Sequence, residues 1–151
     1  MDKSQFISGI FDKYDARLLE NSLTTEGNVC GLLLSDLTFY DDCSLDSKDF
    51  VTKHGRMLFN LGKELRSKGC ANFDEITLLS NVNDDVKEKI ENELGGFRAI
   101  QNIIDVVSVK NMDAFMDELN KRNVLMSLYK KNFNIFEEMT LDSGKKVIPF
   151  D

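Results

Sequence analysis

The sequence has little of several residue types that would point to chemistry or to export. Its 151 residues include one proline, Pro149, and one histidine, His54. Because no earlier proline can break a helix, a mostly helical fold is permitted along nearly the whole chain. The cysteines Cys30, Cys43 and Cys70 lie too far apart in sequence to form the close pairs of a zinc site. We therefore expect free thiols in a reducing cytoplasm.

Long apolar runs and an excess of basic charge are missing as well. No segment approaches the length of a membrane span, and the first residues lack the apolar run of a signal peptide, so we expect neither membrane insertion nor export. Asp and Glu outnumber Lys and Arg by 26 to 19, which gives a net charge of -7. Direct binding of nucleic acid is therefore not expected, since phosphate contacts need basic groups.

Catalytic and cofactor motifs are also absent. The sequence has no GxSxG, HExxH or GxGxxG motif, and the Gly-Lys pair at 144–145 is followed by lysine where a phosphate-binding loop needs Ser or Thr. We expect no catalytic residue, no cofactor and no metal. A small enzyme that uses His54 with Asp41 and Asp42 is an alternative hypothesis. A histidine at a helix start is more typical of a structural residue.

The clearest helical pattern lies between Asp49 and Gly69, where apolar residues recur every three or four positions. Arg66 and Lys68 fall in its last turn, where cations suit the helix dipole, and Gly69 can adopt the left-handed conformation that ends a helix. We expect this helix to be the structural centre of the globular part, with Phe59 in the core.

Two helices are predicted before this segment. A leading amphipathic helix over 4–19 either packs on the core or docks on a partner, and a polar turn follows at 21–26. A second helix begins after the turn and contains Gly27 and Gly31. Because glycine weakens a helix, this pair indicates the close approach of a neighbouring helix.

Short helices and then a long one are predicted in the second half. Asp74 is suited to capping a short helix, and Gly95 with Gly96 ends the next one. A compact apolar helix spans 97–107, and a long helix runs from about Asn111 to Met139. No segment shows the sustained alternation of a strand. The predicted fold class is all-α, a small globular helical bundle followed by a long helical hairpin.

The long helix has apolar residues on more than one side, which a single side of a small core cannot cover. One apolar side contains Met112, Phe115 and Leu119, and the other contains Leu128 and Tyr129. Burial in a helical hairpin and in an oligomer interface would satisfy both sides.

The succession of these motifs resembles the N-terminal domain of DnaB-type replicative DNA helicases. The matching pieces, in order, are Glu26 with VCGLLLSD, Asp49-Phe50, His54, Leu58-Phe59, the helix end at Leu65 to Gly69, DEITL from Asp74, GGF from Gly95 and NMDAF from Asn111. Their order and approximate spacing hold from about Thr24 to Lys130. The leading helix is additional to the family pattern, Phe115 stands where the family usually has tyrosine, and the ATPase half is absent.

The resemblance implies that helical hairpins pair into dimers and that three dimers form a collar over a hexameric motor. The expected partners are a second copy, primase or a helicase loader, and the motor domain. The residues carried over as the surface for self-association or partner binding are Phe97, Ile100, Ile104, Met112, Phe115, Met116, Leu119, Leu125, Leu128, Tyr129 and Phe136. The residues expected to have structural roles are His54, Phe59, Gly69, Asp74, Gly95 and Gly96.

The resemblance also suggests how the chain is divided. Residues 1–23 form the leading helix and turn, 24–95 the globular helical subdomain, 96–140 the hairpin, and 141–151 the start of a linker or a frayed tail. The implied function is that of a non-catalytic collar domain in DNA replication. The alternative is a free-standing regulator from a phage or mobile element that binds a host helicase, loader or primase.

Overall fold

The computed structural model describes residues 16–107, 109–132 and 134–151, so most of the predicted leading helix lies outside the described residues. The α-helices are α2 (Ala16–Ser35), α3 (Lys53–Ser67), α4 (Glu75–Asn81), α5 (Asp84–Glu93), α6 (Phe97–Asp105) and α7 (Met112–Lys130). Short 3-10 helices are η1 (Leu37–Asp42), η2 (Ser47–Asp49) and η3 (Val109–Asn111), and one antiparallel strand pair joins β1 (Met139–Thr140) to β2 (Lys146–Val147). The predicted all-α class is confirmed.

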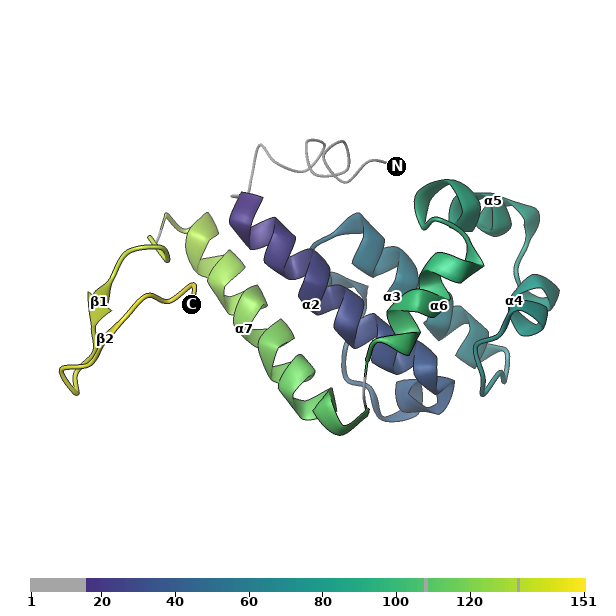
Figure 1. Cartoon of the computed structure of the whole chain (residues 1–151), viewed down its shortest axis with the longest axis horizontal. Coiled ribbons are helices and arrows are strands. Elements are labelled where there is room, and N and C mark those ends of the chain that lie inside the picture. The colour runs from purple at the N-terminus through teal and green to yellow at the C-terminus, as the bar shows by residue number, and fades with distance from the viewer. Residues whose placement is uncertain (1–15, 108, 133) are drawn as a thin grey trace.

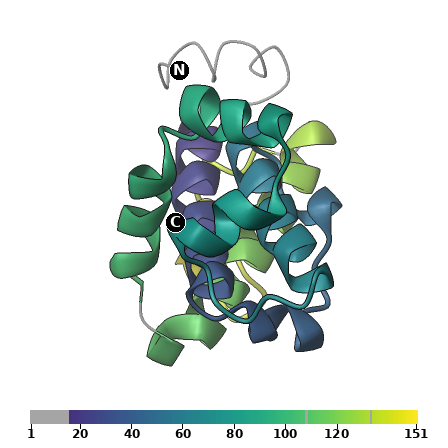
Figure 2. The ribbon, with the colours of Figure 1, turned by 90° about the vertical axis from the view of Figure 1, so that its right-hand side faces the viewer.

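Helix α2 runs through the middle of the molecule. Helix α7 lies beside it in the opposite direction, and α3 and α6 also pack against it (Figure 1). Because α2 has neighbours on several sides, its buried residues are spread around the helix and include Leu18, Leu19, Val29, Cys30, Leu32, Leu33 and Leu34. Helices α4 and α5 form one end of the molecule, and Figure 2 views it from that end.

The predicted polar turn at 21–26 is wrong, because α2 continues unbroken through it. Ser22, Thr25 and Glu26 are buried inside the helix. Polar residues of this kind favour turns when only local propensity acts, but packing on several sides and a buried partner for Glu26 override that preference. The predicted boundary between residues 23 and 24 therefore falls inside α2.

The prediction that the long helix continues to Met139 is also wrong, because α7 ends at Lys130. Asn132 adopts a left-handed conformation, with φ at 66°, which asparagine tolerates better than most residues. The chain then turns back, so that Ile135 is buried against the start of α2 and the end of α7.

Helices α6 and α7, predicted to form a hairpin, each pack against α2. Gly31 allows α6 to come close, since a Cβ atom there would lie 3.0 Å from the Ile103 carbonyl oxygen. The predicted close approach is thus confirmed at Gly31. It is wrong at Gly27, where an added Cβ would meet nothing within 4 Å.

Local helix-end signals agree with the structure. Asp74 caps α4 by accepting a hydrogen bond from the Thr77 N–H at 2.7 Å. Gly69, Gly95 and Gly96 have φ angles of 85°, 82° and 88°, a region that favours glycine. The predicted cap at Asp74, the positive φ at Gly69 and the end of a helix before Gly95 and Gly96 are confirmed.

Candidate functional site

The residues predicted as a partner surface do not form one exposed face. Ile100, Leu119 and Leu125 are only 0%, 1% and 4% exposed. They lie in the interior because α6 and α7 both turn apolar residues toward α2. The assignment of these three to a partner surface is therefore corrected, since a partner cannot reach them in this fold.

The other predicted surface residues are half-buried and divide between two apolar clusters. Phe97, Ile104, Phe115 and Met116 pack against the main core, and Leu128, Tyr129 and Phe136 pack against a smaller cluster. Met112 is also half-buried. These side chains remain partly accessible, and whether they contact a partner stays a prediction.

The smaller cluster, which we call the α2–α7 end cluster, has as its buried residues Leu18, Leu19, Leu125, Met126 and Ile135. Phe136 lies at its edge, with its ring centre 4.9 Å from that of Phe150 and 6.2 Å from that of Tyr129. The Arg17 guanidinium lies 3.6 Å from the centre of the Phe136 ring. This cluster therefore joins both ends of the described chain to α7.

Arg122 holds the C-terminal residues against α7. Its Nη1 donates to the Phe150 carbonyl at 2.9 Å, and its Nε donates to Glu118 at 2.7 Å. The Phe150 N–H donates in turn to the Ile135 carbonyl at 2.9 Å. Residues 141–151, predicted as a linker or frayed tail, thus return to α7. They cover part of the apolar side for which the sequence suggested an oligomer interface.

A few large apolar side chains stay exposed on the described part of the chain: Ile76, Leu79, Val106, Val124, Met139 and Leu141. Val124 is 58% exposed and lies on the outer side of α7. Leu128 follows it by four residues, so the two side chains are neighbours along the helix. They make a short apolar strip on the side of α7 that α2 does not cover.

Glu26 is buried and connects α2 to the start of α3. Its carboxylate accepts hydrogen bonds from the Val51 and Thr52 N–H groups, each at 3.1 Å, and from the Thr52 hydroxyl at 2.8 Å. Burial raises the pKa of Glu26 to about 7, although these hydrogen bonds and Arg56 oppose the shift. In the sequence Glu26 appears only as part of the family motif, and its burial and its bond to Thr52 are not predicted. The available signal was a glutamate directly before an apolar run.

Thr52, not His54, caps α3, because its hydroxyl accepts from the Gly55 N–H at 3.0 Å. His54 lies in the first turn of α3 and is half-buried, and burial lowers its pKa. It lines a pocket together with residues of α2 and α6 and of the end of α5.

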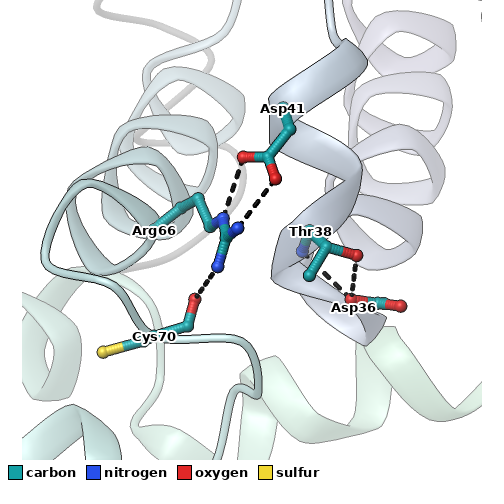
Figure 3. A network of polar contacts seen from close by, with 5 residues as sticks. All are labelled: Asp36, Thr38, Asp41, Arg66 and Cys70. Carbon is teal, nitrogen blue, oxygen red and sulfur yellow. Dashed lines mark hydrogen bonds and ion pairs between the residues drawn. The ribbon is translucent and has the colours of Figure 1, made fainter.

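The hypothesis of an enzyme based on His54 with Asp41 and Asp42 finds no support in the geometry. Asp41 binds the Arg66 guanidinium through two hydrogen bonds of 2.9 Å and 2.7 Å (Figure 3). Hydrogen bonding to Arg66 lowers the pKa of Asp41. His54 and Arg66 are at opposite ends of α3, about 18 Å apart along the helix.

The same close-up shows why the acidic connection is ordered. Arg66 also donates to the Cys70 carbonyl at 3.2 Å, and Asp36 caps η1 by accepting from the Thr38 N–H at 3.0 Å (Figure 3). These contacts tie η1 to the end of α3. Asp36 and Asp41 therefore have structural partners.

The described residues contain neither a metal-binding cluster nor a membrane-spanning helix. No group of three or more His, Cys, Asp or Glu side chains there could hold a metal ion. None of the helices in that part of the chain has the length and apolar character needed to cross a membrane. Cys30, Cys43 and Cys70 are free thiols.

Comparison with known proteins gave one family. The family described as "DnaB-like helicase N terminal domain" matches the chain over residues 18–121. The match begins in the first turn of α2 and ends in the middle of α7. No curated protein and no solved structure matched the chain.

Proposed function

Because the chain belongs to the DnaB-like helicase N-terminal domain family, we propose that it acts as the collar domain of a replicative DNA helicase. The family match over residues 18–121 carries this proposal, since it covers nearly all of the central helix, the whole of α3 and α6, and the first half of α7. The DnaB N-terminal domain is the non-catalytic part of the helicase. Self-association, docking of primase or a loader, and attachment to the motor domain are the proposed roles.

Self-association is proposed along the outer side of α7. The inner side of α7 packs against α2, which leaves Val124 and the accessible part of Leu128 on the opposite side. Tyr129 and Phe136 are not part of this strip, because they pack against the α2–α7 end cluster. Apolar groups in such a strip gain by being removed from water when a second copy packs on them.

Sedimentation velocity of the full chain over a range of concentrations tests this proposal. We expect dimers or larger assemblies, and we expect Val124→Asp to weaken association at least tenfold. Val124 is exposed, so the variant should keep the fold, which circular dichroism verifies. Asn120→Asp, one turn earlier on the same exposed side, adds the same charge and serves as the control. A chain that stays monomeric at high concentration and has no affinity for the cognate primase rules the proposal out.

The alternative, a regulator from a phage or mobile element, makes a different prediction. Such a protein added in trans would inhibit the DNA unwinding of an intact host helicase. A collar domain of the helicase itself acts in cis and is not expected to do so at comparable concentrations. Measuring unwinding with and without the added chain therefore separates the two functions.

A further inference from the structure

A pocket of about 480 Å³ lies between α2, the start of α3, the end of α5 and α6. Its apolar lining residues are Leu23, Leu94, Ile103 and Val106, and its polar ones are Thr24, Asn28, His54 and Glu93. No residue of α7 lines it. The pocket is thus separate from the strip proposed above for self-association.

Gly27 forms part of the pocket wall in the middle of α2. A glycine inside a helix costs about 0.5–1 kcal/mol relative to alanine. At Gly31 the close approach of Ile103 explains why glycine is needed despite that cost. At Gly27, in contrast, an added Cβ would meet nothing within 4 Å. The packing of the described chain therefore gives no reason for glycine at 27. Its effect is to keep the pocket open.

Glu93 supplies the second observation. Its Oε1 pairs with the Lys53 ammonium at 3.0 Å, whereas its Oε2 is buried and accepts no hydrogen bond. A buried acceptor without a donor costs about 1–3 kcal/mol, so a ligand that brings an N–H group would recover that energy. Burial lowers the pKa of the neighbouring His54, so a neutral imidazole does not repel a cation there.

The surroundings favour a cationic occupant. Glu93 also lines a second hollow, together with Asp85, Glu88, Lys89 and Asn92. Around Glu93 the three carboxylates of Asp85, Glu88 and Glu93 outnumber the two ammonium groups of Lys53 and Lys89, so this region favours a basic partner over a second copy of an acidic chain. A basic partner would be attracted to it.

We propose that this pocket binds a basic amphipathic peptide segment of a partner protein. A large apolar side chain of the partner fills the space over Gly27. An adjacent arginine or lysine donates to Glu93 Oε2. Arginine suits the site better, because its planar head group presents several N–H donors to a carboxylate. This would be a partner site in addition to the one on α7.

Titration of the ¹⁵N-labelled full chain with a short capped peptide, in which phenylalanine stands next to arginine, tests the proposal. We expect backbone amide shifts at Gly27, Gly95 and Val106. Two control peptides replace phenylalanine by serine or arginine by glutamate, and each should bind at least tenfold more weakly.

Variants of the chain separate the apolar contact over Gly27 from the polar contact with Glu93. Gly27→Leu fills the pocket and should abolish binding, while Ala114→Leu on the exposed side of α7 should leave it unchanged. Glu93→Gln should remove the preference for the arginine peptide over the glutamate peptide. Gly27→Ala, which adds only one methyl group, verifies that substitution at this position keeps the fold.

Several results would overturn the proposal. Amide shifts elsewhere, or undiminished binding to Gly27→Leu, would show that the pocket is not the site. Nuclear Overhauser contacts between the pocket and residues 1–15, with no peptide binding, would show that the chain's own first residues fill it. All of these readouts are local to the pocket. A negative result would therefore not affect the proposal of self-association, which is tested separately with Val124→Asp.

Discussion

The Glu26 carboxylate and Thr52 are joined by two hydrogen bonds, since Oε1 accepts both the backbone N–H of Thr52 at 3.1 Å and its hydroxyl at 2.8 Å. The same hydroxyl accepts from the Gly55 N–H and so caps α3. One buried side chain on α2 therefore fixes where α3 begins and how it sits against α2. This relationship leads to two of the predictions that follow.

Glu26 makes the stability of the fold depend on pH. Burial raises its pKa from 4.5 to about 7, so the folded state binds a proton more tightly than the unfolded state does. The contribution is then fully present below pH 4.5 and is lost as pH rises to about 7. One pKa unit corresponds to about 1.4 kcal/mol, so the loss is at most roughly 3 kcal/mol.

Urea denaturation of the wild type and Glu26→Gln at about pH 5 and about pH 8 measures this effect. Glutamine resembles the protonated carboxyl and does not titrate. The wild type should therefore lose stability relative to the variant as pH rises. Burial lowers the pKa of His54, which gives a slope of opposite sign below 6.5, but this term cancels in the difference. A difference that does not change with pH contradicts the prediction.

Two glycines of the central helices should respond to alanine in opposite ways. At Gly55 an added Cβ would collide with Glu26 Oε1 and lie 3.0 Å from the Thr52 hydroxyl, so Gly55→Ala should destabilise the fold by about 1–3 kcal/mol. At Gly27 nothing is near, so Gly27→Ala should stabilise it by about 0.5–1 kcal/mol. Thermal melts of both variants measure the change in melting temperature relative to the wild type. Equal changes in the two variants would be inconsistent with the packing around Glu26.

Leu119 and Val124 occupy opposite sides of α7. Substituting each one tests whether Leu119 faces the interior and Val124 faces solvent. Leu119 is 1% exposed, so Leu119→Ala should cost about 2–5 kcal/mol by leaving a cavity. Val124 is 58% exposed, so Val124→Ala should change the free energy of unfolding by no more than about 0.5 kcal/mol. Denaturant titration at low protein concentration measures both. Similar costs for the two variants would mean that α7 is oriented differently.

Features that depend on neighbouring residues could be predicted from the sequence. The Asp74 cap involves Thr77, three residues away, and the left-handed Gly69 follows directly from the end of α3. The continuity of α2 could not be predicted in this way. The polar residues at 21–26 indicate a turn unless one knows that Glu26 meets Val51, which is 25 residues away in sequence.

The accessible surfaces could not be fully predicted from the sequence, for the same reason. Periodicity predicts two apolar sides on the last helix, but Leu119 from one predicted side and Leu125 from the other are both buried in the interior. The sequence pattern alone does not show which apolar groups the chain itself covers. Phe150 packs near Phe136, and its carbonyl accepts a hydrogen bond from Arg122, which lies 28 residues earlier in the sequence. Likewise the pocket depends on Gly27 and Glu93, which are distant in sequence. In the sequence only the glycine pair in α2 gives a signal, and that pair predicts close packing and not a pocket.

Arg122 should be required for the return of the C-terminal residues to α7. It is 7% exposed, donates to Glu118 and to the Phe150 carbonyl, and lies 5.0 Å from the centre of the Phe150 ring. Lysine keeps the charge but cannot form both hydrogen bonds with the same planar group. Arg122→Lys should therefore cost about 1–2 kcal/mol and release Phe150.

Hydrogen exchange at the Phe150 amide reports this release directly, because that N–H donates to the Ile135 carbonyl at 2.9 Å. Loss of a hydrogen-bond partner nearby lowers the free energy of local opening, so exchange at this amide should become at least tenfold faster. Arg98→Lys, an equivalent change at an exposed position of α6, should leave the exchange rate unchanged. Equal protection of the Phe150 amide in both variants would show that Ile135 and Phe136 hold the tail without Arg122.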